Sequence, residues 1–262
     1  MKKLEWLLVV GMAGSGALMA MAGDGTPVTR RGTSVLHYVT RNDLVATEAG
    51  SNAVGWARLQ YNEQGHSLKQ SLQLSIAGLE TNSSYELTAV VGDDTNAAPV
   101  STLTTSRTGR ARVSYFSRGQ GGGGRNPLPA VLSPLTDVRA IGVENGSTQA
   151  VAYAWIADAA RFHYLVKRNL TAEEINGTAA GSINLIANPR HGHFRLLAGG
   201  LTATNDYHLA LNSNVVNTVT SDENGRLRIT TWPSNAPAIL ELRSISLLDS
   251  VSNAVLSTTL PR

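Results

Sequence analysis

Alternation of apolar and polar residues is the dominant pattern along this chain. In Ser71–Ile76, leucine and isoleucine alternate with serine and glutamine, and residues 56–61 alternate in the same way before the turn-forming residues 62–65. A period of two puts every second side chain on the same face of a strand. One apolar and one polar face is typical of an antiparallel sheet with one side in water. The pattern therefore predicts short strands joined by turns.

The predicted strands occur in two sets of similar sequence. His37-Tyr38-Val39-Thr40-Arg41-Asn42-Asp43-Leu44 is answered 126 residues later by His163-Tyr164-Leu165-Val166-Lys167-Arg168-Asn169-Leu170. Tyr207 follows Tyr85 by 122 residues, and Leu242 follows Val138 by 104. The declining distance places deletions between strands of the second copy, where changes of length are tolerated. Self-similarity of this kind predicts an internal duplication.

Each copy contains seven or eight predicted strands with turn signals between them, which is typical of a β-sandwich. We therefore predict an all-β protein made of two tandem immunoglobulin-like, Greek-key β-sandwich domains, at residues 34–156 and 161–262. Thr171-Ala172-Glu173-Glu174 resembles a capping box, so at most one helical turn is expected there. Asn224-Gly225 is a signal for a two-residue hairpin.

The segment between the two predicted domains, Ala157–Ala160, is short. Four residues reach about 13 Å, so the domains must touch or nearly touch. We expect a fairly rigid rod or V of two sandwiches. The alternative is a single closed structure shared by both halves, since duplicated sheets can also pair edge to edge.

The first 22 residues have the features of a secretory signal peptide. Met1-Lys2-Lys3 precedes an apolar run from Trp6 to Ala22, which ends in the small-x-small pattern Ala20-Met21-Ala22. The run is shorter than the roughly 20 residues of a spanning helix, so a retained anchor is the minor interpretation. Residues 23–33 are interpreted as a flexible arm. We expect an extracytoplasmic protein, secreted, at the cell surface or periplasmic, with no membrane span in the mature chain.

Composition narrows the possible partners. The chain has no cysteine, so the exported domains must be stabilised by their cores without disulfides. Its formal net charge is +3, and about +2 without the signal peptide, which is too small to indicate nucleic acid as a partner. The expected partners are instead another copy of this protein, another cell-surface protein, or a polymer.

His191-Gly192-His193 is the sharpest metal candidate, because residues i and i+2 of a strand share a face. No third ligand is identifiable, and Asn188-Pro189-Arg190 immediately before it suggests a turn. Zinc sites need three or four ligands, so we prefer a polar turn and predict no metal, no cofactor and no catalytic residue. The nucleophile motifs of known hydrolases are also missing from the sequence.

Aromatic and basic residues supply the remaining candidates. Equivalent residues of the two copies are interpreted as core or as buried hydrogen-bonding groups: His37 and His163, Tyr38 and Tyr164, Tyr85 and Tyr207, and Phe116 with Trp232. Three tryptophans are candidates for stacking against a sugar: Trp56, Trp155 and Trp232. Four arginines are expected on the outer face of matching strands, where a solvated face is preferred over an anionic polymer site: Arg110, Arg112, Arg226 and Arg228.

Two further patterns point to loops, and one resembles a known family. Residues 119–124 formally contain a GxGxxG pattern, but no helix is predicted after it, so we interpret the run as a flexible loop. Acidic and Asn residues at 93–96 and 222–224 are ordinary turn residues. Leu44 followed by Gly55-x-Ala57-x-Leu59 ahead of a hairpin resembles the opening of chordin-type domains. The His-x-His stretch of that family is missing from the first copy, so nothing is carried over from it.

These observations lead to three functional hypotheses. The first is an exported, non-enzymatic structural or adhesive protein of the cell exterior, which assembles through sheet edges or by strand donation from residues 23–33. The second is a binding module for glycans or another envelope polymer that uses an exposed tryptophan. The third is an unrecognised metal-dependent enzyme centred on His191 and His193. We rank them in this order, because fold alone assigns no function.

Overall fold

The computed structural model describes residues 34–117, 126–172 and 178–260, and this part of the chain is all-β. Its helical segments are 3-10 turns of three residues: η1 (Glu48–Gly50), η2 (Ala130–Leu132), η3 (Leu135–Asp137) and η5 (Ile239–Glu241). No described helix is long and apolar enough to cross a membrane. The predicted signal peptide (1–22), the arm (23–33) and the glycine run (119–124) lie outside the described residues, as do Glu173 and Glu174.

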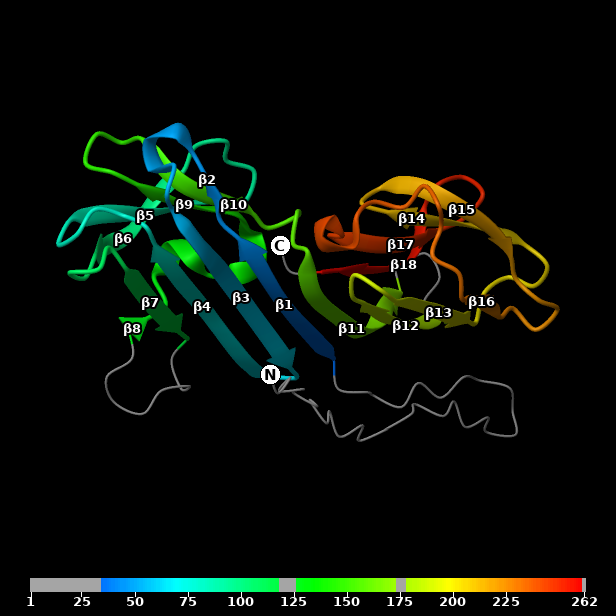
Figure 1. The fold of residues 1–262 in the computed structure, drawn as a ribbon. Helices are drawn as coiled ribbons and strands as arrows, with labels where there is room; N and C mark the ends of the chain where they lie inside the picture. The colour runs from blue at the N-terminus through cyan, green and yellow to red at the C-terminus, as the bar shows by residue number, and fades with distance from the viewer. Residues whose placement is uncertain (1–33, 118–125, 173–177, 261–262) are drawn as a thin grey trace, which may run out of the picture.

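The first half of the chain forms ten strands. They are β1 (Val35–Asp43), β2 (Val45–Ala46), β3 (Val54–Gln64), β4 (Ser67–Ala77), β5 (Ser84–Val91), β6 (Ala98–Thr104), β7 (Ala111–Phe116), β8 (Asn126–Pro127), β9 (Val138–Glu144) and β10 (Ala150–Trp155). One layer has the order β1-β3-β4-β7-β8, and the other has the order β2-β10-β9-β5-β6. Figure 1 shows these two layers in the blue-to-green half of the molecule.

The second half forms eight strands with a corresponding order. They are β11 (Arg161–Ala172), β12 (Ala180–Ala187), β13 (Gly192–Gly199), β14 (Asp206–Leu211), β15 (Asn214–Thr220), β16 (Leu227–Ile229), β17 (Ser244–Leu248) and β18 (Ala254–Thr259). The first layer is β11-β12-β13-β16, and the second is β18-β17-β14-β15. The end of β11 also pairs with β18, just as β2 pairs with β10. The single strand β11 therefore corresponds to both β1 and β2 of the first half.

The two halves are joined by hydrogen bonding between β1 and β11, which lie side by side in Figure 1. The strands are antiparallel and in a register that sets Tyr38 opposite Tyr164. Their rings meet edge to face, with centroids 6.1 Å apart. The predicted closeness of the two halves is confirmed. The sheets of the two halves pair edge to edge through β1 and β11, which was expected only for the alternative arrangement.

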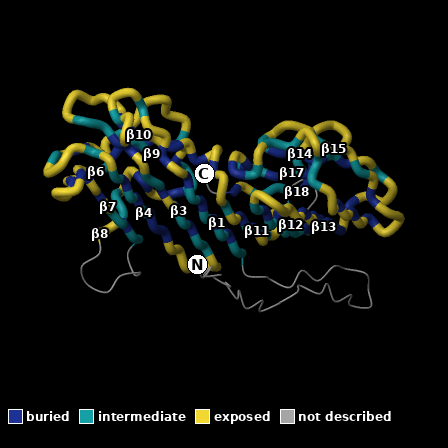
Figure 2. The backbone as a smooth tube through the Cα atoms, in the orientation of Figure 1, coloured by how far each residue is buried: buried dark blue, intermediate teal, exposed yellow. Residues whose placement is uncertain are grey.

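Buried side chains alternate along the strands, as the period-2 pattern requires. In β1 every second residue from Leu36 to Asn42 is buried, and its neighbours are only half-covered. Figure 2 shows this alternation as dark blue and teal along the strands. Tyr38, Tyr164, Tyr85 and Tyr207 are buried, which confirms that they belong to the core. Phe116 and Trp232 are only partly buried, at its margin.

The same turn contacts occur in both halves. The Tyr85 hydroxyl accepts a hydrogen bond from the Glu80 N–H at 3.1 Å, and the Tyr207 hydroxyl accepts one from Thr202 N–H at 3.0 Å. Thr105 Oγ1 donates to the Glu80 carbonyl, and Ser221 Oγ donates to the Thr202 carbonyl, both at 2.6 Å. These hydroxyls satisfy backbone groups where the chain crosses between layers.

The predicted hairpin at Asn224-Gly225 is wrong, although a turn does form there. The strands that flank it, β15 and β16, belong to different layers and do not pair. Asp222 Oδ1 accepts backbone hydrogen bonds from Asn224 and Arg226, which closes the turn locally. The dipeptide therefore gives a tight reversal, but the partner of β16 is set by its apolar face, which packs beside β13.

Candidate functional site

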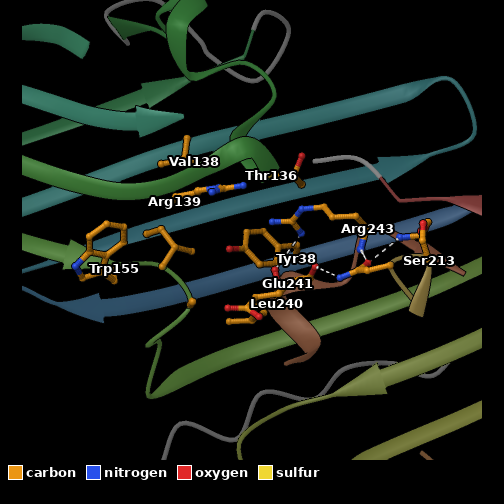
Figure 3. A pocket seen from close by; sticks show the side chains of 13 residues that line it. Tyr38, Thr136, Val138, Arg139, Trp155, Ser213, Leu240, Glu241 and Arg243 are labelled. Atoms are coloured by element: carbon orange, nitrogen blue, oxygen red, sulfur yellow. Dashed lines mark hydrogen bonds between the residues drawn. The ribbon is translucent and has the colours of Figure 1, made fainter. Parts of the chain in front are cut away.

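A cleft of about 570 Å³ lies between the two halves of the molecule. Figure 3 shows it over the inner side of β1, with Tyr38 in its middle and Trp155 at one end. Its lining comes from both halves: Tyr38, Thr136, Val138, Arg139, Trp155, Ile156, Ala157, Asn212, Ser213, Leu240, Glu241, Arg243 and Ser244.

Matching residues of the two halves line this cleft from opposite sides. Arg139 and Arg243 are separated by the same 104 residues that relate Val138 to Leu242. Thr136 and Leu240 obey the same relation, and they lie in η3 and η5 respectively. Tyr38 on β1 is paired with Tyr164, the residue at the corresponding position of β11. The cleft is therefore lined by residues at corresponding sequence positions of both halves.

Polar contacts with the backbone hold the cleft walls in place. Asn42 on β1 donates through Nδ2 to the Trp155 carbonyl at 2.6 Å, which fixes the segment that carries the indole. On the other wall, Asn212 Oδ1 accepts from the Arg243 N–H at 2.6 Å, and its Nδ2 donates to the Glu241 carbonyl at 2.9 Å. Arg243 Nη1 donates to the Leu240 carbonyl at 3.1 Å.

Tyr38, which lines the cleft, and its buried neighbour Tyr164 stay neutral at physiological pH. Burial raises the pKa of Tyr38 to about 12, although the positive charge of Arg243 acts in the opposite direction. Burial also raises the pKa of Tyr164 above its ordinary value of 10.0. Neither phenol can serve as a base near neutral pH, because its deprotonated form is strongly disfavoured.

The cleft chemistry suits binding. It combines the half-exposed indole of Trp155, 49% exposed, with guanidinium and amide groups that can hydrogen-bond to hydroxyls. Glu241 is the one carboxylate among the described lining residues, which include no histidine. An exposed aromatic plane beside hydrogen-bonding groups is an arrangement that can hold a sugar ring.

The structure separates the three predicted stacking tryptophans. Trp155 is exposed in the cleft. Trp56 lies half-buried on the outer face of β3, with the guanidinium of Arg41 4.6 Å from its ring centroid. Trp232 packs edge to face on buried Phe194, at a centroid distance of 5.2 Å. Only Trp155 presents its ring in a cleft, so it is the stacking candidate that we keep.

The predicted metal candidates lie apart from this cleft. His191 is in the bend before β13, where the Asn188 N–H donates to its carbonyl at 2.9 Å. His193 is exposed on β13, opposite Ile186. Among the described residues, no group of three or more His, Asp or Glu side chains is close enough to hold a metal ion.

Two sequence-based placements are wrong. His37 and His163 are not core residues; they lie on the outer face of β1 and β11, with ring centroids 5.5 Å apart. Each histidine directly precedes a buried tyrosine, Tyr38 or Tyr164, and therefore points to the opposite face of its strand. The matching positions of the two histidines indicated matching strands, but they did not indicate that the histidines are buried. Arg110 and Arg226 lie in turns, whereas Arg112 and Arg228 do project from strands.

The sequence analysis did not identify the cleft arginines as site residues. Arg139 and Arg243 were visible only as matching positions in two predicted strands. An available signal was that each half has an arginine two residues after the end of a three-residue 3-10 turn, next to a mostly apolar strand. That these two arginines face one cleft depends on the pairing of β1 with β11, which the sequence left open.

Comparison of the chain with protein-family models and with curated proteins gave no match. The functional argument therefore depends on the geometry of this molecule alone.

Proposed function

We propose that this protein is an exported, non-enzymatic structural or adhesive protein of the cell exterior, and that it assembles with itself through an open sheet edge. The finer architecture belongs to the same proposal: two immunoglobulin-like, Greek-key sandwiches that arose by duplication. Support for the duplication comes from the matching strand orders and from the paired turn contacts of Tyr85 and Tyr207.

The observation that carries the proposal is the edge strand β15. It ends its layer, pairing only with β14 among the described strands, so its other side presents unpaired N–H and C=O groups. Its sequence, Asn-Val-Val-Asn-Thr-Val-Thr, has no charge and no proline, and Val215 is 51% exposed. Natural edge strands are usually blocked by lysine, proline or a bulge. β15 has no lysine and no proline, and its one irregularity is a shift of register against β14 between Leu209 and Ala210, so the rest of the edge can accept another strand.

The edge strand β6, at the end of the five-stranded sheet of the first half, has a blocking feature that β15 lacks. It contains Pro99, which has no N–H to donate to a neighbouring strand. The two outer strands therefore differ in their capacity to pair. This difference favours a dimer in which two β15 edges pair, or capture by β15 of a strand from the arm 23–33 of another copy.

The test is a pair of lysines placed on β15. Val215→Lys with Asn217→Lys puts charge at two exposed positions of the edge, and we expect the assemblies of the exported chain to dissociate into monomers. Light scattering after size exclusion, over a wide range of protein concentration, gives the mass. Deleting residues 23–33 in a separate variant distinguishes strand donation by the arm from edge-to-edge pairing.

The matched control places two lysines on β6, as Thr102→Lys with Thr104→Lys, which adds the same charge at exposed positions. This variant should assemble like the natural chain. Equal dissociation of both variants would attribute the effect to net charge, and a natural chain that is monomeric at every concentration would reject the proposal.

A second candidate, a binding module for glycans or an envelope polymer, is supported by Trp155 in the cleft. Stacking of a sugar on an exposed indole is a large part of such binding. Trp155→Ala should then weaken binding of the glycan by about tenfold in a glycan-array titration, which corresponds to about 1.4 kcal/mol. Trp56→Ala, on the other side of the sheet, is the control that should leave binding in the cleft unchanged.

A further inference from the structure

The pairing of β1 with β11 creates one continuous outer face that neither half has alone. From β7 through β4, β3, β1, β11, β12 and β13 to β16, neighbouring strands are hydrogen-bonded in one sheet. Their outward positions are fixed by the register, since buried residues such as Leu59 and Leu72 point the other way. We call this surface the outer sheet face.

Positive charge is concentrated on the outer sheet face although the chain has a net charge of only +3. The outward positions of its strands carry these cations: Arg41, Arg58, Lys69, Arg112, Arg161, Lys167, Arg195 and Arg228. Asp43, at the end of β1, is the one acidic residue at an outward position of these eight strands. Three histidines, His37, His163 and His193, lie among the cations.

Three of the arginines stand in direct register on adjacent strands. Arg58 on β3 is opposite Arg41 on β1, and Arg41 is opposite Arg161 on β11. Neighbouring strands are about 4.8 Å apart, so the row extends over about 10 Å. Like charges directly opposite one another destabilise a sheet. The row therefore lowers the stability of the junction unless something else offsets the repulsion.

No ion pair within the described part of the molecule involves an arginine of this row, although Asp43 lies on the same face at the end of β1. The two ion pairs in this part, Arg139–Asp93 and Arg168–Glu63, involve none of the outer-face cations. Arg41 stacks on Trp56, yet its Nε has no hydrogen-bond partner. Asn184, between Lys167 and Arg195 in the register, has a buried Oδ1 that is also without a partner. Unsatisfied buried groups of this kind are costly, and they add to the cost of the charged row.

We propose that the outer sheet face, centred on Arg58, Arg41 and Arg161, binds a linear polysaccharide that carries carboxylates. This deepens the proposed adhesive function by naming the polymer, and it rests on that function. Arginine binds carboxylate through two parallel hydrogen bonds, and a row of arginines can engage successive acidic sugars.

The groups between the cations favour a sugar polymer over a nucleic acid. Outward positions of β3 and β4 carry amides that can hydrogen-bond to sugar hydroxyls, namely Gln60, Asn62 and Gln73. Proteins that bind single-stranded nucleic acid need open aromatic platforms for the bases. On this face the ring of Trp56 is instead covered by the guanidinium of Arg41.

The experiment titrates the exported chain with polygalacturonate at about 50 and about 200 mM salt, a range over which polyanion binding changes strongly. The variant Arg41→Gln, Arg58→Gln, Arg161→Gln should bind at least about tenfold more weakly. Its slope of log affinity against log salt should be smaller by about two, since roughly 0.7 counterion is released per contact on a single-stranded polyanion.

The matched control removes three arginines from exposed turns, as Arg107→Gln, Arg110→Gln, Arg190→Gln. It should keep the natural affinity within about twofold, because exposed charges beyond a Debye length contribute little. Fully methyl-esterified polygalacturonate, which has the same backbone without the charge, should not bind to the natural chain. Equal weakening in both triple variants, or equal binding of the esterified polymer, would overturn the proposal.

Two further readouts separate the possible failures. The midpoint of urea unfolding of the outer-face variant should be equal to or higher than that of the natural chain, since repulsion in the row is relieved. Weak binding with a lower midpoint would mean damaged folding and would contradict the repulsion argument. Stronger binding of a single-stranded oligonucleotide at equal charge would reject the polysaccharide. Assembly through β15 is measured without any polymer, so its failure is independent of these outcomes.

Discussion

Gly109 and Gly225 occupy corresponding turns, and each is required for two reasons. Their φ angles are +66° and +67°, a region that L-residues rarely adopt. A Cβ at Gly109 would lie 2.1 Å from the Leu79 carbonyl oxygen, and one at Gly225 would lie 2.1 Å from that of Leu201. The two halves thus use the same residue type to bring the same two turns into contact.

Replacing three glycines by alanine separates the two reasons. Gly109→Ala combines a positive φ with a clash, and it should lower the free energy of unfolding by about 3 kcal/mol or more. Gly92→Ala, with φ +65° and open space around its Cβ, should cost about 1 kcal/mol. Gly146→Ala, which has neither feature, should be neutral in urea unfolding. Equal effects of Gly109→Ala and Gly92→Ala would show that the close approach does not matter.

The charge state of His37 links stability to pH. Burial first, and then the positive charges of His163 and Arg58, lower the pKa of His37 below its ordinary value of 6.5. The unfolded chain therefore takes up a proton at a higher pH than the folded one. This contribution to stability is fully present above about pH 6.5 and is lost as the pH falls toward the lowered pKa.

The His37→Gln variant tests this link. Urea unfolding of the natural chain from pH 8 to pH 5 should show a steeper loss of stability than the variant, because the variant lacks the titrating group. His193→Gln, which removes an exposed histidine on β13, is the control that should keep the natural slope. Parallel curves for His37→Gln and the natural chain would contradict the lowered pKa.

At the scale of elements, the sequence predicted the strands better than their partners. Ser71–Ile76 falls within β4, and its leucines are buried, because a period of two is a local property of a strand. The turn at Asn224-Gly225 was also found, yet its strands lie in different layers. Pairing depends on contacts far apart in the chain, such as β1 with β11, and these leave no local pattern.

The same distinction explains the site residues. Trp155 was a candidate because an indole is rare and chemically specific, and it does line the cleft. His37 and His163 were misplaced, because one step along a strand separates the inner from the outer face. To predict that Arg58, Arg41 and Arg161 lie in one row, the pairing registers of three strands must be known. The spacing of residues in the sequence does not give these registers.

The hydroxyl of Thr105 gives a test of how the layers are connected. It donates to the Glu80 carbonyl and accepts from the Ser83 N–H at 2.8 Å. Thr105→Val keeps the shape but removes the partner of these part-buried backbone groups, so it should lower the free energy of unfolding by about 1 kcal/mol. The neighbouring exposed Thr104→Val should change it by less than about 0.5 kcal/mol. A Thr105→Val variant as stable as the natural chain would mean that water replaces the lost bonds.

At the scale of the whole molecule, two ion pairs form among the described residues, and the less exposed one lies at the junction of the halves. Arg168 Nη2 is 3.0 Å from both carboxylate oxygens of Glu63, and the side chains are only 19% and 24% exposed. Tyr61 donates a further hydrogen bond to Glu63 Oε2 at 3.0 Å. This group links β3 of the first half to β11 of the second, beside the shared pairing of β1 with β11.

Removing one charge from this pair should lower the stability of both halves together. Glu63→Gln leaves the Arg168 guanidinium partly buried without its counter-ion and should cost about 1–2 kcal/mol. Calorimetry should show one transition at a lower temperature. Asp93→Asn, at the exposed pair with Arg139, should change the free energy of unfolding by no more than about 0.5 kcal/mol. Two separate transitions in the natural chain would show that the halves unfold independently.

The antiparallel meeting of β1 with β11 at Tyr38 and Tyr164 is the geometry by which two identical single-body proteins would form a homodimer. In this protein both strands belong to one chain, and only a few residues link the two halves. The effective concentration of β1 relative to β11 is therefore high and does not depend on the protein concentration. The composite surface that spans them is then permanent. A fused pair of this kind can also diverge, with one member keeping its edge blocked and the other leaving its edge free.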